Sequence, residues 1–420
     1  MGILILPSVV SYSRMLSRLA IGLDRQPELI AHVVAKPAGE SDGPRETLPE
    51  RAANILRQAF VTCLNDRSGT SANGVTRDGK PEGKKRGIYT IANLCLKILF
   101  SCHKIRGAAQ IFENIYNQSP PLSAYPKSER VTYLYYLGRF LWANSHFYRA
   151  QKALQQAYNE CHPQCLQQRR LITIFLLASN LACGRFPTQQ LLSRPEAHGL
   201  REHFEPLCRA IARGDICTFR HLLSPESPHY GFFSSCRIDL QLRNRCEVYV
   251  WRSLVRKTFL IHGDPGNPEA KKAPSIDLND LLALWRWQEQ KYMAAGSLPK
   301  AYVDPDLEGL PDNDGTNDET LDLPDINSII SKVASLIHQD LLNGYLSLKV
   351  QKLAIQGART KGALAAGFPV IWKTIVARSD EEVPGWKLDA KTQVGGFARP
   401  QFGPGQVVNL SGVRPVGAFG

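Results

Sequence analysis

The sequence predicts an all-α fold in which a tetratricopeptide-like stack of helix pairs is followed by a winged helix. Two observations support this prediction. Residues 129–188 carry small and large apolar residues at the spacing of one tetratricopeptide-like helix pair. Residues 326–356 read as an apolar helix followed by a short two-stranded wing, which is the element order of a winged helix.

The helix pair is defined by its small residues. Gly138 and Ala150 lie where two antiparallel helices must approach closely, and Leu141 and Leu154 can fill the groove beside them. Leu134, Leu137 and Ala157 complete the pattern. A pair of this kind cannot bury its own apolar face and must stack on neighbours. We therefore expect a stacked scaffold rather than a pocket enzyme.

The composition describes a basic chain with an ordinary apolar content. It has 420 residues, 43% of them hydrophobic and 21% charged, with a formal net charge of +13. This length suffices for about two or three domains. An excess of positive charge favours an acidic partner such as nucleic acid, an anionic surface or an acidic protein. A solvated basic surface is the alternative.

Cysteines and the N-terminus suggest where the protein resides. The ten cysteines have no framework of spacings, so we expect reduced, mostly buried thiols of an intracellular protein. The first residues, MGILILPSVV, lack a basic region and a cleavage site, and are not expected to be a signal peptide. Leu6 stands where myristoylation requires Ser or Thr. No apolar run approaches the roughly 20 residues of a membrane span, so no membrane partner is expected.

The N-terminal part is expected to span residues 1–87. Its pattern predicts helices over 8–34 and 49–64, separated by a loop over 37–49. The polar, Gly-rich and basic residues 65–87 are expected to form a mobile insertion.

Helical repeats are expected over 88–262. Helices are predicted over 88–101 and 107–117, and over 203–213 and 216–223 around a corner at Gly214. Residues 235–262 form one longer amphipathic helix or two.

The winged helix is expected over 263–356. Its first helix is predicted over 275–292, with Ser275, Asp277 and Asp280 as cap candidates. In YLSLKVQKLAI, the residues Leu346, Leu348 and Val350 alternate with polar neighbours, which indicates a strand. The Gly/Pro-rich residues 357–420 are expected to form a tail.

An acidic insertion, 304–325, interrupts this winged helix. Its DNDG resembles a calcium loop with Gly315 at the sixth position. Leu310 and Leu321 then occupy the first and twelfth positions, where carboxylates belong. A disordered insertion is therefore the preferred interpretation.

No constellation of residues indicates catalysis or a bound cofactor. Cys161, His162 and Cys165 form a tight cluster, but a zinc site needs four ligands and no second pair lies at useful spacing. The end of a helix with buried thiols is favoured. Nucleophile elbows, phosphate-binding glycine loops and HExxH are absent from the sequence. We assign no catalytic, cofactor-binding or metal-binding residue and expect no enzyme.

Basic residues are the candidates for a binding site, because phosphate recognition needs flexible cations on one face. The candidate nucleic-acid-binding residues lie in the last repeat helix, on the wing and just after it: Arg243, Arg245, Arg252, Arg256, Lys257, Lys349, Lys352, Arg359 and Lys361. Docking of an acidic protein is the alternative. Trp251, Trp285, Trp287 and Tyr292 could stack on bases, but their spacing favours the core or an interface.

Two segments resemble a known family. RVTYLYYLGRFLWANSHFYRAQKALQQAYNECH with RRLITIFLLASNLACGRFPT, and later HQDLLNGYLSLKVQKLAI, are similar to the PCI-domain subunits of the nuclear transcription-and-mRNA-export complex two. The signalosome-associated PCI subunit twelve is an equally close relative. The resemblance spans about residues 88–356, and departs from the family at the acidic insertion, at GKKRG and in the tail.

The resemblance implies a fold and a function. PCI proteins, named for the proteasome lid, the COP-nine signalosome and translation initiation factor three, combine a helical stack with a winged helix. The resemblance implies a non-enzymatic subunit that pairs with a large helical scaffold subunit and a small acidic subunit. It also implies a nuclear protein that acts in mRNA export at the nuclear pore. A structural subunit of a signalosome-like assembly, without nucleic-acid binding, remains the alternative.

Overall fold

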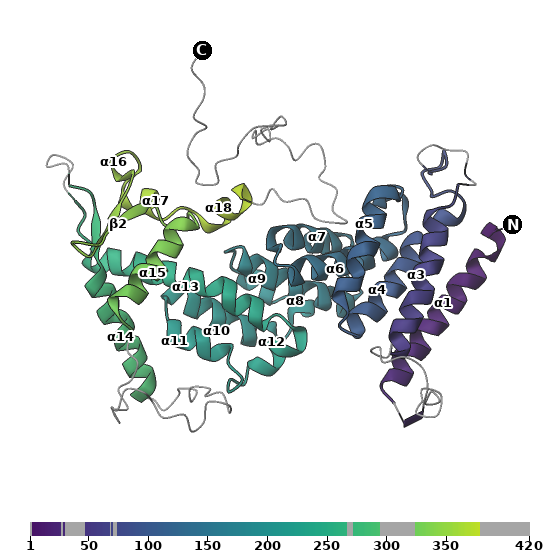
Figure 1. Cartoon of the computed structure of the whole chain (residues 1–420), viewed down its shortest axis with the longest axis horizontal. Helices are drawn as coiled ribbons and strands as arrows, with labels where there is room; N and C mark the ends of the chain where they lie inside the picture. Colours follow the sequence, from purple (N-terminus) through teal and green to yellow (C-terminus); the bar gives the residue numbers. More distant parts are fainter. Residues whose placement is uncertain are drawn as a thin grey trace, which may run out of the picture. The chain divides into compact units, whose positions relative to one another are not determined.

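The protein is a stack of helices that ends in a small winged-helix part (Figure 1). The computed structural model describes residues 2–26, 28–29, 47–67, 69, 74–266, 272–294 and 324–378, all within one compact unit. The predicted fold class is confirmed, because helices dominate and the strands form a single three-stranded sheet. No helix of these residues is long and apolar enough to cross a membrane.

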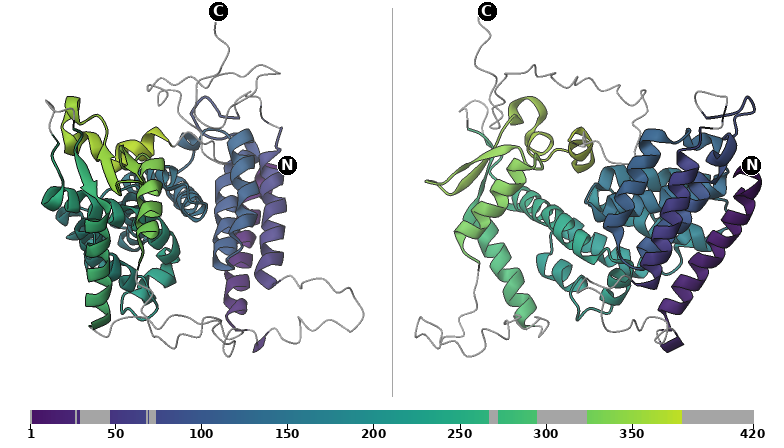
Figure 2. Two further views of the ribbon diagram at one scale, coloured as in Figure 1. Left: turned by 60° about the vertical axis from the view of Figure 1, so that its left-hand side comes forward. Right: turned by 45° about the vertical axis from the view of Figure 1, so that its right-hand side comes forward.

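The first three long helices lie side by side, as the views of Figures 1 and 2 agree. They are α1 (Gly2–Asp24), α3 (Leu48–Leu64) and α4 (Ile88–Ser101). A capping box begins α3: Thr47 N–H donates to Glu50 Oε2 at 2.8 Å, and Glu50 N–H donates to Thr47 Oγ1 at 3.4 Å. The expected helix over 8–34 begins earlier, at Gly2, and α1 ends at Asp24. Residues 30–46, with most of the expected loop, lie outside the described residues.

Residues 74–87 hold specific contacts, so the expectation of a mobile insertion was wrong for them. Gly83–Gly87 form a 3₁₀ helix, η1. The N–H of Lys84 donates to Asp66 Oδ2 at 2.8 Å, and the Tyr125 hydroxyl donates to the Lys85 carbonyl at 2.9 Å. Residues outside the segment thereby satisfy one of its backbone N–H groups and one of its carbonyls, which composition alone does not reveal.

The predicted helix pair is confirmed as α6 (Lys127–Ala143) and α7 (Phe147–Glu160), with α8 (Leu166–Ala182) stacked on both. Before it come η2 (Ile105–Ala108), α5 (Ala109–Gln118) and η3 (Leu122–Ala124). A Cβ added at Gly138 would lie 2.5 Å from Cγ of Leu154. The two helices therefore cross at this glycine, as the spacing predicted.

The stack continues through shorter helices to one long helix. These elements are α9 (Gln189–Leu192), η4 (Pro195–Ala197), α10 (Leu200–Arg213), α11 (Ile216–Leu222), α12 (Tyr230–Cys236) and α13 (Asp239–His262). The corner at Gly214 has φ +70°, and an added Cβ would lie 2.7 Å from the Leu254 nitrogen. Glycine is therefore required both by the left-handed backbone and by close packing on α13.

The winged-helix part combines two helices with a three-stranded antiparallel sheet. Its elements are β1 (Ser275–Asp277), α14 (Leu278–Ala294), α15 (Ile326–His338), β2 (Gly344–Ser347) and β3 (Lys352–Ile355). The strand order is β1–β3–β2. Ser275, expected as a helix cap, lies in β1 instead, because it pairs with Ala354.

The wing itself differs from the alternating strand that was expected. Residues 348–351 form the turn between β2 and β3, and Gln351 has φ +52°. Leu348 and Val350 therefore lie at an exposed tip rather than in a strand. The acidic insertion lies outside the described residues up to residue 323. Asp325 caps α15 by accepting the Ser328 N–H at 2.8 Å.

Residues 358–377, expected as tail, form the short helices α16 (Ala358–Lys361), α17 (Ala363–Gly367) and α18 (Ile371–Ala377). α18 lies between the winged-helix part and α7 (Figure 1). The Trp372 ring contacts the Tyr148 ring edge-on, with centroids 5.3 Å apart, and Arg185 Cζ lies 3.4 Å from the Trp372 centroid. These aromatic and cation–π contacts, not the Gly and Pro content, decide the structure here. The tail beyond residue 378 lies outside the described residues.

The cysteines are described in full. All ten are free thiols, and six are buried: Cys63, Cys95, Cys161, Cys183, Cys217 and Cys246. In the CHPQC cluster, Cys161 is buried after the end of α7, whereas Cys165 is exposed before α8.

Candidate nucleic-acid interface

Helix α13 positions five of the predicted basic residues, but it turns them in different directions. Arg243 and Arg256 are exposed, and Lys257 is partly exposed. Arg245 and Arg252 instead point toward other parts of the chain and are half-buried. The shared face inferred from the four-residue spacing of Arg252 and Arg256 therefore does not make both available to a ligand.

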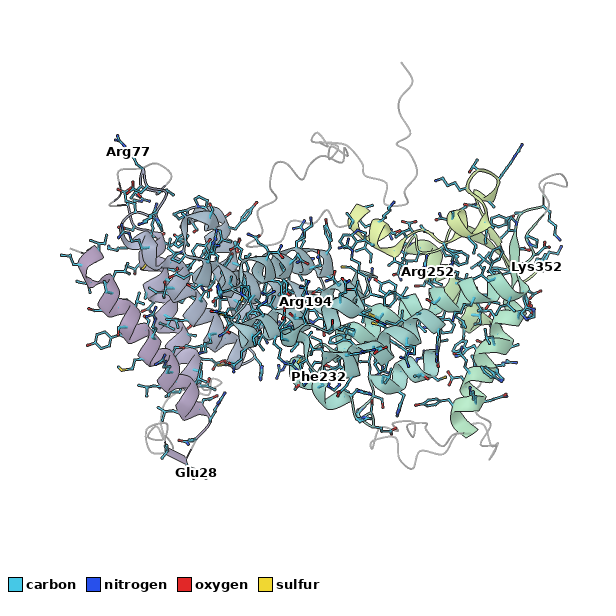
Figure 3. The ribbon with its side chains drawn as sticks, turned by 180° about the vertical axis from the view of Figure 1, so that it is seen from behind. Glu28, Arg77, Arg194, Phe232, Arg252 and Lys352 are labelled. Atoms are coloured by element: carbon cyan, nitrogen blue, oxygen red, sulfur yellow. The ribbon has the colours of Figure 1, made fainter. Side chains whose placement is uncertain are left out.

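Arg252 joins α13 to the winged-helix part. Its Nε donates to the Leu341 carbonyl at 3.1 Å, and Nη2 donates to the carbonyls of Phe368 at 3.1 Å and Pro369 at 2.7 Å. Burial, reinforced by the positive charge of Arg256, lowers the pKa of Arg252 to about 10. In the view of Figure 3, Lys352 lies at the outer end of the winged-helix part, and Arg252 lies nearer the helical stack. Arg252 therefore stabilises the fold.

Arg245 lies at a different place, beside a cavity of about 410 Å³. Its Nη1 donates to Gln339 Oε1 at 3.3 Å, and its guanidinium lies over the Tyr249 ring, 5.6 Å from the centroid. Arg149 and Arg378 also line this cavity, between the start of α7 and α18. The structure thus separates Arg245 from the cations of the wing.

The sheet places Lys352 on its exposed face. In the antiparallel register, Lys352 lies between Asp277 of β1 and Ser347 of β2. Its neighbours Leu353 and Ile355 are 0% and 2% exposed and face the core. Because side chains alternate along a strand, Lys352 must point to the other side. Lys349 is exposed at the tip, flanked by Leu348 and Val350.

Arg359 and Lys361 lie on α16 and are exposed. Arg359 lines a cavity of about 470 Å³ whose wall also includes Lys272 and Ile355. Lys272, which sequence reasoning missed, forms an ion pair with Asp264. The hydrogen bond from Lys272 does most to lower the pKa of Asp264, and Lys352 adds to this effect by its charge. Lys272 and Lys352 therefore both stabilise the negative charge of Asp264.

Sequence reasoning also missed Tyr345, whose side chain is 52% exposed on β2. It lies opposite Ala354 and therefore on the same face of the sheet as Lys352. Its signal was present in the alternation of YLSLKVQKLAI, but the wrong strand length hid it. By contrast, Trp251 and Trp285 pack edge-on with centroids 4.7 Å apart in the core. Trp287 is exposed on α14, and Tyr292 lies near His221.

This arrangement suits an extended anion. Cations on long side chains occupy the outer end of α13, the wing and α16, and α13 contacts β1 directly. Such cations can follow a phosphate backbone without reading base edges. Among the described residues, no group of three or more His, Cys, Asp or Glu side chains could hold a metal ion.

Comparison with known proteins shows that the chain is similar in sequence to PCI domain-containing proteins. No family model matches the chain. A PCI domain-containing protein of Schizosaccharomyces pombe is 29% identical over 337 residues, which are 80% of this chain and 64% of that protein. A CSN12 homolog of Neurospora crassa is 30% identical over 217 residues, 51% of this chain and 45% of that protein.

A third relative is PCI domain-containing protein 2 of Danio rerio, which is 30% identical over 210 residues, 50% of this chain and 48% of that protein. The chain thus spans less than two thirds of the length of each of these relatives. Its helical stack and winged helix are the architecture that the resemblance to PCI proteins implied. The chain is thus similar to PCI domain-containing proteins and CSN12 homologs, and its mostly helical fold agrees with this similarity.

Proposed function

We propose that the chain is a non-enzymatic PCI-domain scaffold subunit of a nuclear complex that couples transcription to mRNA export. In this role it binds a large helical scaffold subunit and a small acidic subunit, and it contacts RNA or DNA through its basic winged-helix face. It acts in the nucleus, at the nuclear pore. The observation that carries the nucleic-acid part is the exposed set of cations at the outer end of the molecule.

Six side chains make up this basic face: Arg256, Lys257, Lys349, Lys352, Arg359 and Lys361. They come from three elements that the contacts between α13, the sheet and α17 hold together. Arg252 and Arg245 are left out, because their donors are used within the chain. Arg243 is exposed nearer the start of α13, and it contacts the nucleic acid only at the edge of this face.

A second candidate is a structural subunit of a signalosome-like assembly that binds no nucleic acid. The similarity to a CSN12 homolog favours it. Exposed apolar residues at the tip, Leu348 (64%) and Val350 (59%), suit a protein partner as well.

Charge reversal of the basic face separates the two candidates. The variant carries Arg256→Glu, Lys257→Glu, Lys349→Glu and Lys352→Glu, and fluorescence anisotropy across a salt series measures its binding to RNA and DNA oligonucleotides. We expect binding to be lost, since these cations contact phosphates. Any residual binding should have a log-log salt slope that is shallower by about 0.7–0.9 for each phosphate contact removed. Size-exclusion chromatography with the co-purified partners reports assembly.

A matched control reverses four exposed cations elsewhere: Arg18, Arg51, Lys97 and Lys127. It changes the net charge equally and should leave most of the binding intact. Unchanged binding in the basic-face variant would contradict the nucleic-acid role. If its binding and its assembly were both lost, the same charges would form a protein interface, and the structural subunit would be the better description.

A further inference from the structure

We propose that the exposed face of the wing sheet is a platform for single-stranded nucleic acid, on which Tyr345 stacks against an unpaired base. The inference rests on the proposed nucleic-acid binding and specifies the ligand class of that same face. It begins from Tyr345, whose side chain is 52% exposed although it lies within a strand of the sheet. Ring contacts within the described residues occupy many of the other aromatic side chains, but none involves Tyr345.

The sheet register decides which side chains share the platform. Tyr345 lies opposite Ala354, and Ala354 lies opposite Ser275 on β1. The two residues next to the tyrosine in this row are therefore small, and Asp264, which is paired with Lys272, follows opposite Ser275. A planar base that lies on the ring meets no bulky neighbour in this row. The opposite face of the sheet carries Ile276 and Leu353, which are 2% and 0% exposed.

The next row supplies charge. Lys352 is two residues from Ala354 along β3 and is therefore a diagonal neighbour of Tyr345, about 7–8 Å away between backbones. A four-carbon stem lets its ammonium reach a phosphate next to a stacked base. Asp277 lies opposite Lys352, but its carboxylate accepts the Asn279 N–H at 2.9 Å at the start of α14. Lys349, at the tip, adds a second exposed cation.

A single strand fits this combination better than a duplex. In a duplex, each base covers the faces of its neighbours, so an exposed tyrosine ring has nothing to stack on. In a single strand, bases can stack on aromatic side chains while cations follow the backbone, and this stacking tolerates any sequence. The platform thus predicts a preference for single strands with little base specificity.

The test uses fluorescence anisotropy to compare the binding of two probes to the full-length chain. One probe is a 15-mer of oligouridine without a label on its bases, and the other is a duplex DNA of equal length. Tyr345→Ala should weaken binding of oligouridine about 5- to 100-fold, as expected for the loss of one base–aromatic stack. Duplex binding should change less than about twofold, and the salt slope should stay the same because no phosphate contact is lost. Tyr345→Phe keeps the ring and should bind as the unmodified chain does.

Two controls make failures distinguishable. Tyr12→Ala removes another exposed tyrosine, 69% exposed on α1, and should leave both probes unaffected. Lys349→Glu with Lys352→Glu tests the basic face by itself. If this pair weakens binding and Tyr345→Ala does not, the platform is wrong and the basic face stands. If neither probe binds the unmodified chain, both proposals are wrong.

Discussion

Single residues decide how closely the helices of the stack can approach. At Gly138, a Cβ would lie 2.5 Å from Cγ and 2.7 Å from Cδ2 of Leu154, which is fully buried. We expect Gly138→Ala to lower the free energy of unfolding by about 1–3 kcal/mol through overpacking, and Gly138→Leu to cost more. Urea denaturation measures both.

The matched control is Gly22→Ala on α1, where nothing lies within 4 Å of the added Cβ. It should be neutral or stabilise by about 0.5–1 kcal/mol, because alanine favours a helix. Because the two side chains collide, Gly138→Ala should cost less stability in a Leu154→Ala background than in the unmodified chain. Equal stability of the chain and Gly138→Ala would show that the helices do not cross there.

Arg252 and Arg256 offer a second comparison at the same scale. Arg252→Met removes the donor from the carbonyls of Leu341, Phe368 and Pro369 and should cost about 1–3 kcal/mol in thermal or urea unfolding. Arg256→Met, one turn away and exposed, should leave stability within about 0.5 kcal/mol and weaken nucleic-acid binding. If Arg256→Met lowered stability and Arg252→Met did not, the structural role of Arg252 would be contradicted.

Among the helical elements, the contact between α10 and α12 should respond to pH. The Nδ1 atoms of His203 and His229 lie 3.3 Å apart, and the His203 ring stacks on Phe232, which Figure 3 labels. Burial lowers the pKa of His203, and the charges of His229 and Arg170 lower it further, against the raising effect of Glu202.

The direction of the change in stability with pH follows from proton binding to His203. Below about pH 6.5 the unfolded chain takes up a proton at this histidine more readily than the folded chain does. The contribution of His203 is therefore present at neutral pH and is lost as the pH falls below this value. We expect His203→Phe to show a smaller fall in Tm between pH 7.5 and 5.5 than the unmodified chain. An identical fall in both would contradict this role.

The helices α16–α18 should be part of the folded unit. A chain that ends at Gly357 loses Phe368, which is 6% exposed, and two of the carbonyls that Arg252 contacts. We expect this chain to melt at a lower temperature and to be cut faster by protease than a chain that ends at Arg378. Equal behaviour of the two chains would show that α16–α18 add nothing to the fold.

How well an element was predicted depends on how local its cause is. Gly138, Leu154 and the corner at Gly214 were found because helical spacing and glycine are short-range signals. Arg252 was misassigned to the binding face because its acceptors lie 89 to 117 residues further along the chain. α18 was missed because its anchor, Trp372, is held by Tyr148 and Arg185 from distant repeats. Charge could be read from the sequence, but the direction of each side chain could not.

At the scale of the whole molecule, helix α1 presents an apolar side to solvent. Leu4, Ile5, Tyr12, Met15 and Leu19 are each between 52% and 80% exposed. We expect the chain without partners to self-associate as its concentration rises, which sedimentation velocity can measure. Leu4→Lys with Met15→Lys should reduce this association at unchanged Tm. A monodisperse unmodified chain would show that this face needs no cover.

The three hydrogen bonds of Arg252 have a consequence for how the stack comes apart. In an array where each helix pair contacts only its neighbours, unfolding starts at a free end and proceeds one pair at a time. Arg252 links α13 to the winged-helix part, and Trp372 contacts Tyr148 of α7 and Arg185 just after α8, so this end is held at two places. At the other end, the contacts of α1 are with α3, η1 and α4, which are all near it along the stack. Loss of order should therefore travel in one direction along the chain, and amide protons of α1 should exchange before those of α13.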